Sequence, residues 1–369
     1  MLKLDLLEDQ FDRQKKIVWW DQERLLNSKV LLVGAGALGN EIAKNLSLVG
    51  VGQITIVDND IVDLTNISRC VFFNEDDIGK YKAELLSTRI KSLRDIKSDY
   101  FIGKIQELGI GIYENFDIVI GALDNREARS WVNEYSRMFS KPWVDGAIEG
   151  LNGLVRTFGI DGVCYECTLS EEDLKLLSVR KSCALLSEEE ISIGKVPTTA
   201  TSASIISGFQ TQETLIYLSR KKIELMPLNS QQMTFFGETM TFLKTKLKEK
   251  KDCYVDHESI TFKKINVDYN QKIKNLIKKH NINPSSRLYR EIVRNCVCVE
   301  CDNNKLVNKY ISSLKQKDVL CKDCNNEMQL ETENNIDKLG DYSLNEINFP
   351  DNELIISEEK YILLIKEIK

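Results

Sequence analysis

A glycine-rich stretch near the start of the chain has the pattern of a nucleotide-binding loop. Gly34, Gly36 and Gly39 form Gly-x-Gly-x-x-Gly within VGAGALGNEIAKNLSLVG, and Asp58 and Asp60 follow in QITIVDND. Glycines let the backbone approach phosphate groups closely, and an acidic residue about 20 positions further on can bind ribose hydroxyls. The pattern alone is typical of a dinucleotide site, so the residues that follow must identify the nucleotide.

The next stretch carries more positive charge than a dinucleotide requires. DLTNISRCVFFNEDDIGKYKAE holds Asn66, Arg69, Lys80 and Lys82 within one loop and the start of a helix. A triphosphate needs such cations, because its leaving pyrophosphate must be neutralised as the bond between the α- and β-phosphates breaks. Asp124 ends the expected strand FDIVIGALDN, where a carboxylate can hold Mg²⁺. Each residue alone could be a surface charge or a cap, but together they favour ATP with Mg²⁺.

The elements that must position these residues alternate between strand and helix. LNSKVLLVGAG predicts a buried strand, ALGNEIAKNLSLVG a helix and QITIVDND a second strand, which together make a β–α–β unit. Further strand and helix patterns alternate up to about residue 150. We therefore expect an α/β fold with a Rossmann-like, doubly wound and mostly parallel sheet.

Beyond residue 150 the pattern changes. The sequence predicts a hairpin strand at 151–160, a long apolar helix at 198–220 and strand-like alternation in QQMTFFGETMTFLKTKL. The expected segments are a main domain at 1–257, a linker or helical insert at 258–290, a cysteine-rich module at 291–330 and an acidic tail with a small β module at 331–369.

The composition is that of an ordinary soluble protein. The 369 residues are 42% hydrophobic and 29% charged, and MLKLDLLEDQFDRQKK lacks the apolar core of a signal peptide. No run approaches the roughly 18 apolar residues of a membrane span. Residues 244–280 hold eleven Lys against five acids, but without Arg and with few aromatics, which favours a solvated surface over a nucleic-acid interface. We expect a cytoplasmic protein with no membrane or nucleic-acid partner.

The ordered set of motifs resembles the ubiquitin-activating-enzyme superfamily, which includes ThiF, MoeB and the activators of ubiquitin-like proteins. The family pattern is Y-x-R-Q, a glycine-rich loop, D-x-D, S-N-x-x-R-Q, G-x-x-K-A and D-N-x-x-x-R. This chain supplies Phe11-Asp12-Arg13-Gln14, Gly34/Gly36/Gly39, Asp58-Asn59-Asp60, Thr65-Asn66-Ile67-Ser68-Arg69, Gly79-Lys80-Tyr81-Lys82-Ala83 and Asp124-Asn125 with Arg129. The resemblance covers about 1–257 and implies a ThiF-type adenylation domain. The chain departs from the pattern at Phe11, Thr65 and Cys70, and Cys70 removes a polar amide beside Arg69.

The resemblance implies adenylation of a protein C-terminus and assigns roles to the motif residues. Asp58 would bind the ribose, with Asp60 supporting that end of the site. The phosphate and metal ligands it implies are Asn66, Arg69, Lys82, Asp124 and the adjacent Asn125. Arg13 would reach the active site of a neighbouring subunit, which implies a homodimer. A C-terminal carboxylate is already ionised at pH 7 and needs no general base, in keeping with the lack of a histidine near these motifs.

The cysteines predict zinc. Cys298-x-x-Cys301 and Cys321-x-x-Cys324 are separated by nineteen residues, which is a zinc-ribbon spacing. The family often pairs a knuckle such as Cys164-Tyr-Glu-Cys167 with a distant second one, where this chain has Cys253-Tyr-Val-Asp-His257. We expect a second zinc site of Cys164, Cys167, Cys253 and His257. A rival pairing joins Cys164 and Cys167 to Cys298 and Cys301.

Cys183 lies where the family places a cysteine before the long helix. In some members this cysteine attacks the adenylate and carries the protein as a thioester. Arg180 and Lys181 would lower the pKa of the thiol, while the acids at 188–190 would oppose that.

Three functions remain open. The leading hypothesis is activation of a ubiquitin-like protein that ends in glycine. The second is activation of a sulfur-carrier protein or a short peptide. The third is a non-catalytic scaffold, which the presence of Arg69, Lys82 and Asp124 disfavours. The C-terminal tail weakly resembles tails that recruit a conjugating enzyme or carrier, although a strand pair packed on the ribbon is the favoured expectation.

Overall fold

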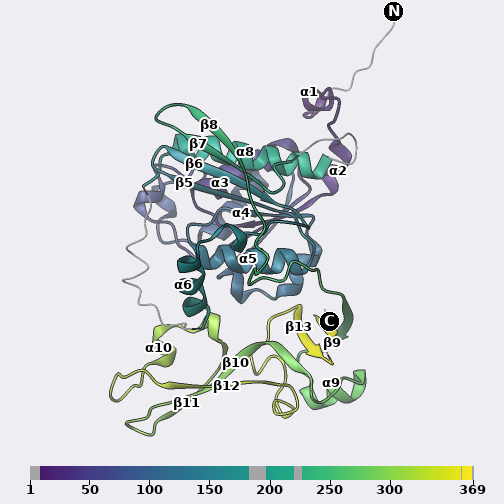
Figure 1. Cartoon of the computed structure of the whole chain (residues 1–369), viewed down its shortest axis with the longest axis vertical. Helices are drawn as coiled ribbons and strands as arrows, with labels where there is room; N and C mark the ends of the chain where they lie inside the picture. Colours follow the sequence, from purple (N-terminus) through teal and green to yellow (C-terminus); the bar gives the residue numbers. More distant parts are fainter. Residues whose placement is uncertain (1–8, 183–196, 220–226, 359, 368–369) are drawn as a thin grey trace, which may run out of the picture. The chain divides into compact units, whose positions relative to one another are not determined.

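The computed structural model describes residues 9–182, 197–219, 227–358 and 360–367. These residues form two compact units (Figure 1). The first unit comprises the described residues within Met1–Ile105, Tyr113–Thr168 and Val196–Glu258; the second comprises those within Gln106–Ile112, Leu169–Lys195 and Ser259–Lys369.

The first unit is built on an eight-stranded sheet in the order β3-β2-β1-β4-β5-β6-β7-β8. The strands are β1 (Lys29–Val33), β2 (Gln53–Asp58), β3 (Lys97–Ile102), β4 (Ile118–Gly121), β5 (Trp143–Glu149), β6 (Asn152–Phe158), β7 (Gln231–Phe236) and β8 (Thr241–Lys246). Strands β1 to β5 are parallel, and β5 to β8 pair antiparallel. The expected α/β fold with a mostly parallel, doubly wound sheet is therefore confirmed.

Helices cover both faces of this sheet (Figure 1). The helices of this unit are α1 (Asp12–Lys15), α2 (Gln22–Asn27), α3 (Ala37–Val49), α4 (Lys82–Leu93), α5 (Arg126–Met138) and α8 (Ala200–Ser219), of which α1 buries no residue. Helices α3, α4 and α8 share one hydrophobic core with the sheet, including Leu32, Ile42, Ile56, Leu86 and Leu215. Helix α5 lies on the opposite face. This layering follows from the apolar spacing of the helices and from strands that are buried on both faces.

The second unit contains a six-stranded sheet in the order β11-β10-β13-β14-β9, with β12 also paired to β10. Its elements are α6 (Glu171–Ser182), β9 (Phe262–Val267), α9 (Ile273–His280), β10 (Arg287–Val297), β11 (Asn304–Tyr310), α10 (Gln316–Val319), β12 (Gln329–Asn335), β13 (Glu353–Ser357) and β14 (Lys360–Lys366). Short 3₁₀ turns in the two units are η1 (Leu64–Asn66), η2 (Glu75–Asp77), η3 (Ile105–Glu107), η4 (Ile110–Asn115), η5 (Glu166–Thr168) and η6 (Ile311–Ser313).

The stretch 258–290 differs from the linker or helical insert that the sequence suggested. It contains the expected helix, α9, but also strand β9, which pairs in parallel with β14 of the C-terminal tail. The tail forms the expected strand pair, since β13 and β14 pair antiparallel. Strand β13 also pairs antiparallel with β10. Insert, cysteine-rich module and tail thus contribute to one sheet.

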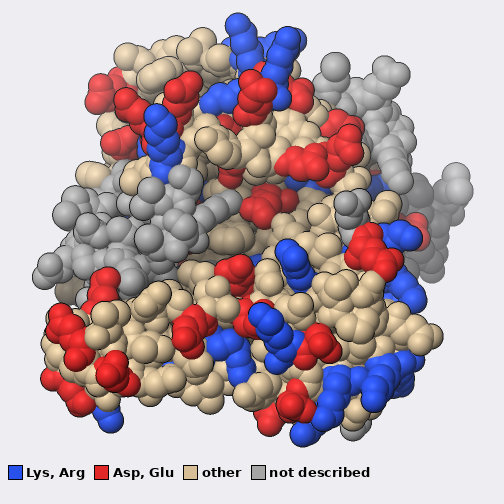
Figure 2. All heavy atoms as spheres, turned by 60° about the horizontal axis from the view of Figure 1, so that its bottom comes forward, with Lys and Arg blue, Asp and Glu red and all other residues tan. Residues whose placement is uncertain are grey.

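Charged side chains of both signs are interspersed over much of the face shown in Figure 2. On α9, Ile273, Leu276 and Ile277 are buried, while Lys274 and Lys278 are exposed. The lysine-rich stretch therefore includes the solvated face of an amphipathic helix. Among the helices within the described ranges, none combines the length and apolar character that crossing a bilayer requires.

Candidate active site and metal centres

The glycine-rich loop joins the end of β1 to the start of α3. Gly34 has a φ of +105°, and a Cβ there would lie 2.2 Å from the carbonyl oxygen of Ala122. A Cβ on Gly39 would lie 2.0 Å from the carbonyl oxygen of Gly34, whereas nothing lies within 4 Å of a Cβ on Gly36. Two glycines are thus required by packing, and the third, which is the N-cap of α3, borders open space. Free N–H groups at such a helix N-terminus suit a phosphate.

Asp58 ties this loop to the end of β2. One carboxylate oxygen accepts a hydrogen bond from the backbone N–H of Ala35 at 2.6 Å, and the other accepts one from that of Asp60 at 2.7 Å. Burial raises the pKa of Asp58 to about 6, although the charge of Lys82 and these two hydrogen bonds oppose the increase. The ionised carboxylate can accept hydrogen bonds from hydroxyl groups of a ligand at either oxygen.

Lys82 is the first residue of α4, and it is buried. Its Nζ lies 2.9 Å from a carboxylate oxygen of Asp60, and its backbone N–H donates to the carbonyl of Asp60, also at 2.9 Å. Burial opposes the charge of Lys82, but the carboxylates of Asp58 and Asp60 outweigh it and raise the pKa of the ammonium. The raised pKa favours the charged form of Lys82, so a cation is held beside the end of β2.

The loop between β2 and α4 is stiffened by its own side chains. Asp63 and Asn66 form a reciprocal capping box, each accepting a hydrogen bond from the backbone N–H of the other, at 3.0 and 3.2 Å. Arg69 is partly exposed and donates to the carbonyl of Thr65 at 2.5 Å. Burial raises the pKa of the Cys70 thiol to about 11, although Arg69 and Lys82 oppose it. Cys70 belongs to the main hydrophobic core, which explains how an apolar thiol replaces the family's glutamine.

Asp124 follows β4, which pairs directly with β1. The strand order reverses between these two strands, so the loops after β1 and β4 border the crevice where open α/β sheets bind ligands. Asp124 is exposed, and its Oδ1 accepts a hydrogen bond from Asn125 Nδ2 at 3.2 Å. Asn125 also caps α5 by accepting from the N–H of Ala128 at 2.8 Å. An exposed carboxylate at this place fits an oxygen-seeking cation such as Mg²⁺.

Arg13 lies elsewhere on the first unit. Gln14 donates to the carbonyl of Val49 at 2.9 Å, and a Cβ on Gly50 would touch the ring of Phe11, so α1 packs at the C-terminal end of α3. The glycine loop is at the opposite end of this helix, about 20 Å away for 13 residues. The Arg13 side chain is exposed. The structure therefore brings Asp58, Asp60 and Lys82 together but leaves Arg13 apart from them. Cys183 lies outside the described residues.

One residue that the sequence analysis did not single out fixes the site from within. Asn40, on the first turn of α3, is fully buried. Its amide nitrogen donates to the carbonyl of Ala35 at 2.8 Å, and its oxygen accepts from the N–H of Phe72 at 3.1 Å. It thus joins the glycine loop to the loop that carries Asn66 and Arg69. Asn40 directly follows the last glycine of the pattern. Its hydrogen-bond partners Ala35 and Phe72 lie 5 and 32 residues away in the sequence, so the pattern alone did not predict its role.

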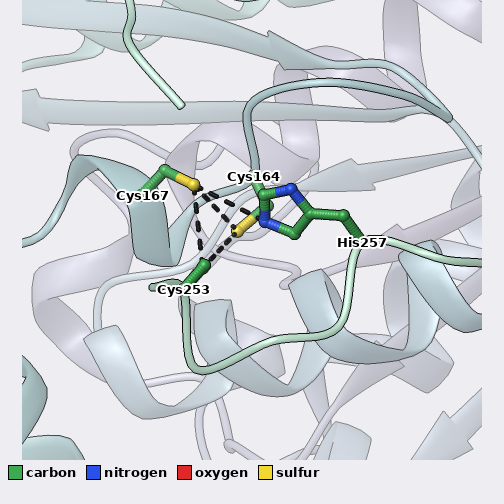
Figure 3. Close-up of side chains that lie close together, drawn as sticks. All are labelled: Cys164, Cys167, Cys253 and His257. Atoms are coloured by element: carbon green, nitrogen blue, oxygen red, sulfur yellow. Dashed lines mark hydrogen bonds between the residues drawn. The ribbon is translucent and has the colours of Figure 1, made fainter. Parts of the chain in front are cut away.

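The first unit also contains a cluster with the geometry of a metal centre (Figure 3). Cys164 Sγ lies 3.7 Å from Cys167 Sγ and 3.5 Å from Cys253 Sγ, and Cys167 Sγ lies 3.6 Å from both Cys253 Sγ and His257 Nε2. Four ligands at about 2.0–2.3 Å from one tetrahedral zinc ion lie about 3.5–3.8 Å apart. His257 Nδ1 lies 2.8 Å from a carboxylate oxygen of Glu249, which would orient the ring. The donor set and spacing fit zinc.

A second cluster lies in the second unit and consists of Cys298, Cys301, Cys321 and Cys324. Cys298 and Cys324 are 3.5 Å apart at sulfur, and Asn303 Nδ2 donates to Cys321 Sγ at 3.3 Å. Hydrogen bonds from backbone N–H groups and from Asn303 lower the pKa of Cys321 to about 6, which favours the thiolate. Each cluster draws all four candidate ligands from a single unit, and the cysteines group as the two-centre prediction had them.

This chain is similar in sequence to a known protein family and to several curated proteins. Residues 10–255 match the ThiF family. The NEDD8-activating enzyme E1 catalytic subunit of Schizosaccharomyces pombe is 40% identical over 151 residues, covering 39% of this chain and 34% of that protein. The SAMP-activating enzyme E1 of Haloferax volcanii is 33% identical over 178 residues, covering 46% of this chain and 66% of that protein. The chain thus spans about a third to two thirds of the length of these two curated relatives.

Solved structures share the fold. That of E. coli MccB with ATP has a TM-score of 0.56 at 20% identity and covers 68% of this chain and 75% of its own. At this identity the likeness concerns the fold. Because the family match spans well over half of the residues, this chain belongs to the ThiF family, as the motif resemblance predicted.

Proposed function

We propose that this protein activates the C-terminal carboxylate of a ubiquitin-like protein by ATP-dependent adenylation. The observation that carries the proposal is the charged Lys82, held by Asp60 within electrostatic range of Asp58. Such a preformed cation beside a nucleotide loop suits charge that develops on phosphate oxygens. Relatives in the same family are named as activating enzymes of NEDD8 and SAMP and as a sulfur carrier protein adenylyltransferase.

In the proposed reaction, a carboxylate oxygen of the carrier protein attacks the α-phosphorus of ATP. The bond from that phosphorus to the bridging oxygen breaks, and pyrophosphate leaves with the electron pair. The glycine loop and Asn66 would bind the phosphates, and Asp58 would accept the ribose hydroxyls. Lys82 and Arg69 would neutralise the departing pyrophosphate, with Mg²⁺ supplying further positive charge when held at Asp124 and Asn125. No general base is needed, so positioning and charge account for the rate.

We propose a homodimer in which Arg13 serves the site of the second copy. Arg13 is anchored about 20 Å from its own glycine loop by a 13-residue helix, which is farther than an arginine side chain reaches. Since the arginine is exposed, it is free to enter a site on another subunit. In a two-fold dimer each copy would complete the other.

The carrier is proposed to be a protein rather than a small molecule. Strand β8 is the edge of the eight-stranded sheet, and Met240, Phe242 and Leu243 on or beside it are exposed apolar side chains. Such side chains suit contact with a folded partner. The alternatives are a sulfur-carrier protein or a short peptide, and a conjugating enzyme remains a proposed later partner.

A second step is proposed on the sequence alone. The Cys183 thiolate would attack the acyl carbon of the adenylate, forming a thioester while AMP leaves with the electron pair. Cys183→Ala should keep adenylation and lose the reductant-sensitive conjugate on a non-reducing gel. Survival of that conjugate in the variant would rule out this step at Cys183.

Zinc is proposed as structural at both cysteine clusters. Closed four-ligand sites of this kind contribute folding energy and leave no open position for a reacting group. Both clusters have four protein ligands, and neither includes a residue of the nucleotide site.

ATP–pyrophosphate exchange tests the function. Candidate carriers are a ubiquitin-like protein ending in Gly-Gly, a sulfur-carrier protein and a short peptide, each added separately to the purified chain. Exchange that depends on a ubiquitin-like protein supports the proposal, and exchange only with a sulfur carrier or peptide supports an alternative. No exchange with any carrier would favour the non-catalytic scaffold.

A further inference from the structure

The loop that carries Asp124 is held at three successive residues by three different elements. Gln210 Nε2, from helix α8, donates to the carbonyl of Gly121 at 2.8 Å. The backbone N–H of Ala122 donates to the carbonyl of Val33 in β1 at 2.8 Å. Arg129 Nη2, from helix α5, donates to the carbonyl of Leu123 at 2.5 Å. An exposed side chain at 124 thus projects from backbone that is fixed immediately before it.

Arg129 makes further contacts that lock its own position. It is buried, its Nη2 also reaches the carbonyl of Gly146 at 3.1 Å, and its Nε donates to Asp145 Oδ1 at 3.0 Å. The other oxygen of Asp145 accepts two hydrogen bonds from Arg156, at 3.2 and 2.5 Å. Asp145 is fully buried, so both oxygens are spent within this cluster. Only the planar fork of a guanidinium can serve three acceptors in these directions at once.

We infer that Arg129 is a positioning residue that fixes the Asp124 loop for Mg²⁺–nucleotide binding. This inference rests on the proposed function, since it assumes that Asp124 acts on the metal-bound phosphates. Arg129 itself is enclosed and would not touch the nucleotide. Substituting Arg129 would therefore reduce the gain in ATP affinity that Mg²⁺ gives. It would not change the affinity for the adenosine, which Asp58 at the end of β2 is proposed to bind.

Arg137 offers a matched control on the same helix. It is also buried and also donates to backbone carbonyls, at Gly159 (3.2 Å) and Gly162. Neither carbonyl belongs to the loop at 121–124. Arg129→Lys and Arg137→Lys each remove one buried guanidinium, so a general loss of stability should affect both.

Calorimetric titration of the full chain with ATP, with and without Mg²⁺, and with AMP tests the inference. Mg²⁺ should raise the affinity for ATP by the same factor in the wild type and in Arg137→Lys. In Arg129→Lys this factor should be about 10-fold smaller, as for other residues that support metal ligands. AMP affinity should be equal in all three proteins. A wild-type Mg²⁺ effect in Arg129→Lys would overturn the inference.

Two further results are decisive. If Arg129→Lys does not fold, Gln210→Met is tested in its place, because it removes the hydrogen bond to the carbonyl of Gly121 in the same loop. Gln210→Met should reduce the effect of Mg²⁺ on ATP affinity. An unchanged effect overturns the inference. If the wild type binds no ATP under any condition, the proposed function fails and the inference with it. If the wild type binds ATP more tightly with Mg²⁺ but Arg129→Lys shows the same effect, only the inference about Arg129 fails and the proposed function stands.

Discussion

Lys82 Nζ and Asp60 Oδ2 form an ion pair at 2.9 Å, which joins the first turn of α4 to the residues just after β2. The pair is half-buried, because Lys82 is enclosed while Asp60 faces solvent. A cation fixed by its own backbone and side-chain bonds needs little rearrangement when a phosphate arrives. This relationship leads to the first prediction.

Lys82→Ala should lower the rate of ATP–pyrophosphate exchange by about 10²–10³-fold, as for other preorganised charges. Lys80→Ala is the matched control. The sequence grouped Lys80 with the phosphate-binding cations, but in the structure it is exposed and its Nζ lies 3.5 Å from Asp77. The Lys80→Ala variant should retain nearly all exchange activity. Equal losses in the two variants, measured at saturating carrier, would show that Lys82 has no special role.

The glycines of the loop should separate folding from binding. Gly34→Ala places a methyl group against the carbonyl of Ala122 at a positive φ, and should destabilise the fold by about 2 kcal/mol or more. Gly36→Ala meets open space at a negative φ, so its melting temperature should stay near that of the wild type. Its ATP affinity should nevertheless fall, because the methyl group would occupy space expected for phosphate. Thermal melts and ATP titrations measure both; unchanged ATP affinity in Gly36→Ala would argue against a phosphate there.

ATP binding should depend on pH through Asp58. Burial raises the pKa of this carboxyl to about 6, so the folded protein keeps the proton longer than the unfolded chain does. The part of the stability that depends on this proton is present below the unfolded pKa and is lost as the pH rises through about 6. The ionised carboxylate accepts stronger hydrogen bonds from ribose hydroxyls than the protonated carboxyl does, so ATP affinity should rise as the pH increases through about 6. The terminal phosphate of ATP also ionises at about pH 6 to 7, so Asp58→Asn should bind weakly and lose only the part of the rise that comes from Asp58. A pH profile with the full wild-type slope in this variant would contradict the assignment.

Metal analysis of the purified chain should find two zinc ions. Cys253→Ser and Cys321→Ser should each remove one, because each cluster offers four ligands. Cys296→Ser is the control, since Cys296 is buried beside the second cluster but is outside the ligand set. A single zinc in the wild-type protein would contradict the two-centre account.

Mixing inactive variants should reveal a shared site. Arg13→Ala and Lys82→Ala should each be inactive as homodimers. In an equal mixture that exchanges subunits, about a quarter of the sites combine an intact Lys82 with an intact Arg13 from the other copy. Exchange activity should recover to that level. No recovery, with subunit mixing verified by differently tagged chains, would place Arg13 outside the shared site.

Much of this architecture could be predicted from the sequence because its signals are local. The glycine spacing and the apolar run before it predicted β1, the loop and α3, and these elements are present. Strand β9 was missed because FKKINV has a lysine-rich, largely exposed pattern, and its partner β14 lies nearly a hundred residues later. Such an edge strand is defined by its pairing, which no local pattern encodes.

Some residues of the candidate site could also be predicted from local sequence, whereas others are defined by contacts between separate elements. The places of Asp58, Lys82 and Asp124 follow from motifs at the ends of strands and at the start of a helix. The contributions of Asn40, Arg129 and Gln210 depend on which carbonyls they meet in the folded chain, at Ala35, Leu123 and Gly121. Those contacts arise from packing of separate elements, so residue type and spacing could not reveal them.

The central claim is adenylation of a carrier's C-terminal carboxylate. The most direct measurement compares ATP–pyrophosphate exchange with a ubiquitin-like carrier whose terminal carboxylate is free and with the same carrier carrying a C-terminal amide. The account predicts exchange with the free carboxylate that disappears with the amide, because only the carboxylate can attack the α-phosphorus. Equal exchange with both carriers would contradict it.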